Sequence, residues 1–107
     1  DVAKGAGARL SGVEPPSFPD EEVTFDELQQ RISKTIEFLS GLAQEQIDGS
    51  EDKTVTLKAG DQEYQFKGLD YLHSFVLPNV YFHCTTAYNI LRHGGVEIGK
   101  MDFLGVR

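Results

Sequence analysis

The chain has 107 residues, with 17 acidic and 10 basic side chains, which gives a formal net charge of -7. This length supports one hydrophobic core, so we expect a single domain over residues 1–107. The acid excess argues against nucleic-acid and anionic-membrane surfaces, because both require a cationic patch. No apolar run could span a bilayer, and no signal-peptide pattern is present. We therefore expect no membrane partner and a cytoplasmic location.

The first twelve residues predict a short helix. Gly12 lies where a C-terminal cap would fall, and Pro15 and Pro16 prevent the helix from continuing. The apolar residues that recur at helical spacing are Val2, Ala3, Ala6 and Leu10. Because this pattern is typical of the last turns of a longer helix and no initiating Met precedes it, we expect a chain truncated at its N-terminus.

A second helix is predicted over residues 24–42, after an extended, proline-rich surface connection over residues 13–23. Thr24 is followed three residues later by Glu27, which is the spacing of a capping box. The apolar stripe of this helix is predicted to be core. Its members are Phe25, Leu28, Ile32, Ile36 and Leu39.

Residues 43–52 are polar and predict a short turn, after which the hydrophobic period changes from 3.6 to 2. Two alternating runs flank Gly60 and Asp61, so residues 53–67 predict a β-hairpin. Two strands alone are marginally stable, and the hairpin must therefore cover the end of a helical bundle. The residues expected to face that bundle are Val55, Leu57, Tyr64 and Phe66.

Residues 69–93 predict a long, mostly apolar helix that ends before Gly94. Pro78 has no N–H and would clash with the carbonyl of Ser74, so the helix should kink or restart there. The tail after Gly94 is predicted to be a loop, with Ile98, Phe103 and Leu104 folded back onto the helices.

All three histidines lie in this last helix. Asn79 and His83 are four residues apart and share one face, and we expect them to project together into the interior of the bundle. Without further context, a histidine on such a helix is either a hydrogen-bonded core residue or a ligand. His93 lies at the helix end, where a cation interacts favourably with the dipole. Cys84 points about 100° away from His83, so adjacency gives no Cys–His nucleophile pair.

The aromatic residues of the same helix form a second candidate group, which is either core or the wall of a pocket. Its members are Tyr71, Phe75, Tyr81, Phe82 and Tyr88.

Residues 79–99, with the sequence Asn-Val-Tyr-Phe-His-Cys-Thr-Thr-Ala-Tyr-Asn-Ile-Leu-Arg-His-Gly-Gly-Val-Glu-Ile-Gly, resemble the closing helix and tail of the DinB/YfiT-like superfamily. The motifs Gly-Val-Glu-Pro-Pro, Leu-Pro-Asn-Val-Tyr-Phe-His and Gly-Lys-Met-Asp-Phe are similar to those of an uncharacterised bacterial branch known as a domain of unknown function. The resemblance implies a mainly all-α fold: a DinB-like four-helix bundle, here with an inserted β-hairpin and without its first one and a half helices.

In the wider superfamily, three histidines can hold a divalent metal, one from the second helix and two from the last. The resemblance implies that His83 occupies the second position of the terminal pair and that Asn79 replaces the first histidine. The third ligand would lie upstream of Asp1. The chain thus offers an incomplete site for a divalent metal such as Zn or Ni. The open side of such a bundle favours pairing with a second copy of the chain.

Two hypotheses follow. In the first, the chain is a metal-dependent transferase or isomerase of the DinB/YfiT type, with His83 as ligand or general base. In the second, which the missing histidine favours, the chain is a non-catalytic, homodimeric bundle that can bind a small molecule. The residues expected to line a pocket near Asn79 and His83 are His73, Tyr81, Thr86 and Tyr88.

Overall fold

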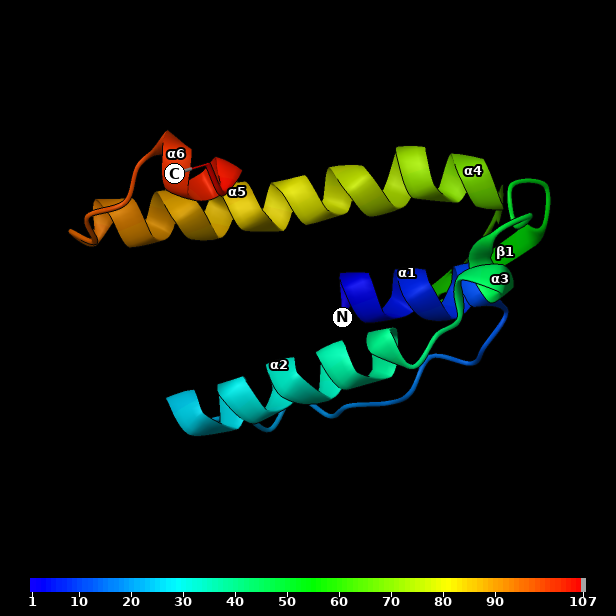
Figure 1. The fold of residues 1–107 in the computed structure, drawn as a ribbon, viewed down its shortest axis with the longest axis horizontal. Coiled ribbons are helices and arrows are strands. Elements are labelled where there is room, and N and C mark those ends of the chain that lie inside the picture. The colour runs from blue at the N-terminus through cyan, green and yellow to red at the C-terminus, as the bar shows by residue number, and fades with distance from the viewer. Residues whose placement is uncertain (107) are drawn as a thin grey trace.

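The computed structural model describes residues 1–106, which are mostly helical with one two-stranded antiparallel sheet (Figure 1). In chain order the elements are α1 (Val2–Ser11), α2 (Phe25–Ser40), α3 (Gln44–Ile47), β1 (Thr54–Ala59), β2 (Gln62–Lys67), α4 (Gly68–Asp70), η1 (Tyr71–Val76), α5 (Leu77–His93) and α6 (Lys100–Leu104). No helix in this part of the chain is both long and apolar enough to cross a membrane.

Helix α1 lies between α2 and α5, and both of these longer helices continue past its first residue (Figure 1). Gly12 ends α1 in the left-handed conformation with φ 76°, which confirms the predicted glycine cap. A Cβ atom on Gly7 would lie 2.5 Å from Leu39 Cδ2 and 3.0 Å from Leu42 Cδ1. The absence of a side chain at this position therefore lets α1 approach the C-terminal end of α2 closely.

Helix α2 begins with the predicted capping box. The Thr24 Oγ1 accepts from the Glu27 N–H at 3.2 Å, and the Glu27 Oε2 accepts from the Thr24 N–H at 2.8 Å. The expectation that its whole apolar stripe is core is wrong for the described chain. Leu39 is half-buried beside α1, but the stripe towards the N-terminus is exposed, from 45% at Leu28 to 88% at Phe25. Only the part of the stripe that lies next to α1 is covered.

The predicted hairpin forms at the other end of the molecule. In its register Val55 pairs with Phe66 and Leu57 with Tyr64. Val55 and Leu57 are buried and Phe66 is half-buried, as expected, whereas Tyr64 is 43% exposed. The segment before the hairpin, predicted as a turn, contains the one-turn helix α3, whose Ile47 packs against the core.

The last long helix changes its hydrogen bonding where Pro78 predicts an interruption. Residues Tyr71–Val76 form the π-helix η1, and α5 restarts at Leu77 with Pro78 in its first turn. Pro78 has no N–H to donate to the preceding turn, and the change from π-helical to α-helical bonding lies directly before it. Helix α5 then runs to His93 and ends at Gly94, as the sequence predicts.

The tail is not entirely loop, because residues Lys100–Leu104 form the short helix α6. It lies beside the C-terminal half of α5, where the Phe103 and Tyr88 rings meet edge to face with centroids 5.9 Å apart (Figure 1). Ile98 is half-buried, while Phe103 and Leu104 remain 41% and 52% exposed. The tail residues therefore pack onto the helices only in part, although the sequence predicts that all three do.

The core lies at the hairpin end, between α1, β1 and η1. Half-buried side chains of α3, β2, η1 and α5 pack around it. The buried residues of the cluster are Ala6, Leu10, Val55, Tyr71 and Val76.

Candidate functional site

His83 lies on the side of α5 that faces the beginning of α1. Together with Val80 and Cys84 it lines a hollow of about 320 Å³, which Asp1, Val2 and Ala3 close from the α1 side. Asn79 is one turn before His83 on the same side of α5, about 40° away around the helix. The hollow is mostly apolar, with one imidazole, one thiol and one carboxylate at its border.

The expected burial of the Asn79–His83 pair is wrong for the described chain. The His83 side chain is exposed and Asn79 is half-buried. The Phe82 ring meets the His83 imidazole edge-on, with centroids 5.3 Å apart. Cys84 is also exposed and free. The imidazole therefore lies at the rim of the hollow rather than inside a packed bundle.

The four expected pocket residues do not gather around His83. At about 100° per residue, Thr86 lies roughly 60° from His83 on α5, but Tyr81 and Tyr88 lie roughly 140–160° away on the opposite side. Tyr88 contacts α6 instead and accepts a hydrogen bond from Arg92 Nη1 at 2.8 Å. His73 is exposed on η1, in the preceding π-helical segment. Of the expected set, Thr86 alone shares the side of α5 that carries His83.

The aromatic residues of this segment separate into two groups. Tyr71 is buried and stacks on Phe75 with centroids 5.7 Å apart, and both rings contact Phe66 of the hairpin. Tyr81 and Phe82 are exposed. The first group is core, and neither group forms the wall of the His83 hollow.

The possible metal ligands within residues 1–106 do not fit a divalent metal site. Within residues 1–106, no three His, Cys, Asp or Glu side chains come together as possible ligands. The three-histidine site that the sequence resemblance implies would need two imidazoles on the last helix, whereas α5 presents His83 and the carboxamide of Asn79 at these positions. A carboxamide is a weak neutral ligand for Zn or Ni.

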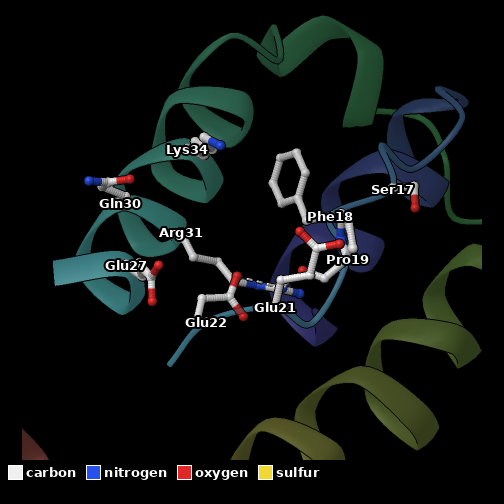
Figure 2. Close-up of a pocket in the computed structure, with 9 residues that line it drawn as sticks. All are labelled: Ser17, Phe18, Pro19, Glu21, Glu22, Glu27, Gln30, Arg31 and Lys34. Atoms are coloured by element: carbon white, nitrogen blue, oxygen red, sulfur yellow. Dashed lines mark hydrogen bonds and ion pairs between the residues drawn. The ribbon is translucent and has the colours of Figure 1, made fainter. Parts of the chain in front are cut away.

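A second hollow, of about 300 Å³, lies between α2 and the connection that precedes it (Figure 2). Arg31 reaches across from α2 and donates to the Pro19 carbonyl and the Glu22 carboxylate, both at 2.9 Å. It also donates to Asp1 Oδ1 at 2.8 Å and pairs with Asp20 at 3.0 Å. One guanidinium thus fastens the connection and the start of α1 to the middle of α2.

These contacts shift the ionisation of the groups involved. The hydrogen bond from Arg31 lowers the pKa of Glu22, and the same bond raises the pKa of Arg31. Burial lowers the pKa of Lys4, whose ammonium lies 4.4 Å from the centre of the Phe18 ring. Because Arg31 pairs with three carboxylates of the chain itself, we describe this arrangement as a structural clasp.

The sequence did not predict the contacts of Arg31. Its partners Asp1 and Glu22 are thirty and nine residues away in the chain, so helical spacing does not reveal them. The run of three acids at Asp20, Glu21 and Glu22 before an arginine-bearing helix is the only local signal.

Three comparisons place the chain among known proteins. Residues 1–104 match the domain of unknown function DUF1993. A search of the curated proteins finds no match. The chain is similar to a solved structure, a DinB family member protein from Shewanella denitrificans, with 38% identity and a TM-score of 0.85. That match covers 100% of this chain and 61% of the solved chain. The chain therefore belongs to the DinB-like family described as a domain of unknown function, DUF1993.

Proposed function

We propose that this chain is a small-molecule-binding DinB-like protein that acts without a catalytic metal. The observation that carries the proposal is the hollow between α1 and α5, with His83 at its rim and Asn79 in place of the first histidine of the family pattern. Val2, Ala3 and Val80 supply apolar contact area, and the imidazole supplies one hydrogen-bonding group. This combination suits a small, mainly apolar molecule with one polar substituent.

The first experiment tests the absence of a metal function. We expect the purified protein, supplemented with Zn²⁺ or Ni²⁺, to show no stoichiometric metal by mass spectrometry and no change in thermal stability. His83→Ala should behave identically. A stoichiometric metal that depends on His83 would overturn the proposal in favour of the metal-dependent transferase or isomerase, for which the family position of His83 is the supporting observation.

A second experiment tests the hollow itself with a matched pair of probes. Phenol and benzene have nearly the same shape, but phenol can hydrogen-bond to the imidazole. We expect both to shift the NMR resonances of Val80 and Ala3, with phenol bound more tightly. In His83→Ala that preference should disappear while the free energy of unfolding changes by less than about 0.5 kcal/mol, because the side chain is exposed. Unchanged resonances with both probes would contradict a binding role.

We also propose that the protein is a homodimer that covers the exposed stripe of α2. Phe25, Ile32 and Ile36 are 88%, 50% and 58% exposed on one side of this helix, and Ile90 of α5 is 66% exposed. A row of exposed large apolar side chains along one side of a helix is typical of an interaction surface. An isologous contact would pair this surface with its own copy.

Sedimentation equilibrium measures this association directly. We expect a dimer whose dissociation constant rises at least about tenfold in Ile32→Lys, because a charge would be buried in the contact. Gln30→Lys is the matched control, since residue 30 lies on the opposite side of α2 and should leave association unchanged. A monomer at every concentration, or equal effects of the two variants, would contradict the dimer.

A further inference from the structure

Arg9 is a half-buried cation whose charge has no carboxylate partner within residues 1–106. None of the ion pairs in this part of the chain involves Arg9, whereas Arg31 pairs with three carboxylates. Arg9 makes one side-chain hydrogen bond, from Nη1 to the Tyr71 hydroxyl at 3.2 Å. A guanidinium has five N–H donors, so most of its capacity is unused.

Two neighbours of this guanidinium are Gly5 of α1 and the Tyr71 hydroxyl. A Cβ atom on Gly5 would overlap Arg9 Nη1, so the glycine provides the space in which the guanidinium lies against α1. Its acceptor, Tyr71, is 1% exposed and is held by stacking on Phe75. Within residues 1–106, no buried side-chain nitrogen lacks a hydrogen-bond partner, so the other N–H groups of Arg9 are open to solvent.

Arg9 lines a hollow of about 430 Å³ between the end of α1 and strand β1. Three polar side chains of the strand line it as well: Thr54, Thr56 and Lys58. They alternate with the buried Val55 and Leu57 and therefore share the outer face of β1. The residues that line the hollow thus include two cationic and two hydroxyl-bearing side chains, in a chain whose net charge is -7.

Two carboxylates are near this group. Glu14 lines the hollow, and Glu63 is the register partner of Lys58 on β2. Neither forms an ion pair with Arg9 or Lys58 within the described residues. Both cations therefore remain available to an external anion.

We propose that this hollow binds the phosphate group of a small organic molecule. A guanidinium can donate two parallel hydrogen bonds to a phosphate, an ammonium adds a point charge, and threonine hydroxyls can donate to the remaining oxygens. A phosphate dianion gains more from two cations than a monovalent carboxylate does. The volume also leaves room for an organic substituent beside the phosphate. The site is separate from the His83 hollow and does not depend on its function.

The test is an NMR titration with inorganic phosphate and with phenyl phosphate, at ionic strength held constant with sodium chloride. We expect saturable shifts at Thr54, Thr56 and Arg9, with phenyl phosphate bound more tightly. Lys58→Gln and Thr56→Val should each weaken phenyl phosphate binding at least threefold. Lys100→Gln is the matched control, because it removes a lysine of α6, which lies outside this hollow at the other end of the molecule from β1 (Figure 1).

Arg9→Lys keeps the positive charge but removes the planar guanidinium, which can donate two parallel hydrogen bonds. It should weaken phenyl phosphate binding at least fivefold. Because Arg9 also bonds to Tyr71, thermal unfolding of this variant is measured first; if it unfolds, Lys58→Gln and Thr56→Val decide the question. The proposal is overturned by shifts that do not saturate, by equal affinities in Lys58→Gln and Lys100→Gln, or by acetate binding as tightly as phosphate, which would assign the hollow to carboxylates.

Discussion

The two ends of the η1–α5 helix carry similar side chains with opposite burial. At the hairpin end Tyr71 is 1% exposed and Val76 is 5% exposed, whereas farther along the helix Tyr81 is 58% and Ile90 is 66% exposed. Tyr71 and Val76 pack against α1, whereas the part of α5 that carries Ile90 extends past the first residue of α1, and Tyr81 lies on the side of α5 turned away from α1 (Figure 1). Amphipathic spacing thus identifies the side of a helix that is suited to burial. Whether that side is buried depends on which other element packs against it.

The largest effect should come from removing a ring at the buried end. Tyr71→Ala deletes a side chain that stacks on Phe75 and accepts from Arg9, and we expect a loss of about 3–5 kcal/mol in the free energy of unfolding. Tyr81→Ala removes the same ring from the exposed part of α5 and should cost less than about 0.5 kcal/mol. Urea denaturation measures both, and similar losses would show that the exposed end is also packed in solution.

Two glycine substitutions test the same difference between the hairpin end and the opposite end of the molecule. A Cβ atom on the buried Gly68 would overlap the Ser50 carbonyl oxygen, and backbone atoms cannot move aside easily. We expect Gly68→Ala to cost about 2–3 kcal/mol. At the other end, Gly99 has an extended backbone with φ -136° and its nearest neighbour would lie 3.9 Å away. Gly99→Ala should be nearly neutral in thermal unfolding, and an equal cost at both glycines would contradict this assignment.

The smallest effect concerns the clasp around Arg31, which solvent reaches. The folded-state pKa of Glu22 lies below the ordinary value of 4.5 because Arg31 bonds to it. Its contribution to stability is therefore fully present above about pH 4.5 and is lost as the pH falls through the lowered pKa. Glu22→Gln should reduce the dependence of stability on pH below 4.5, while Glu21→Gln, which removes a carboxylate not bonded to Arg31, should not. Acid titrations followed by circular dichroism compare the two.

The local elements could be predicted from local signals. Thr24 with Glu27 gave the start of α2, Gly12 gave the end of α1, and Gly60 between two alternating runs gave the hairpin. Pro78 also marked the position at which π-helical bonding gives way to α5. Each of these features depends on residues within a few positions of one another, so sequence spacing contains the necessary information.

The candidate sites depend on distant residues and were predicted less well. Asn79 and His83 do share one side of α5, but the burial of His83 depended on a facing helix that spacing cannot supply. Tyr88 was assigned to the His83 pocket, yet five residues of helix place it about 140° away from His83, where its ring contacts Phe103 of α6. Arg9 was not singled out at all, because its acceptor on Tyr71 lies 62 residues later in the chain.

The long sequence separation between α1 and its partners has a consequence for the order of folding. Helix α2 and the hairpin close over short loops and can form within microseconds. The core, by contrast, joins Ala6 and Leu10 to Tyr71 and Val76, so a loop of about sixty residues must close before their burial stabilises the chain. We expect the docking of α1 to be the slow step of refolding, and amides near Tyr71 to resist hydrogen exchange far longer than those near Ile90.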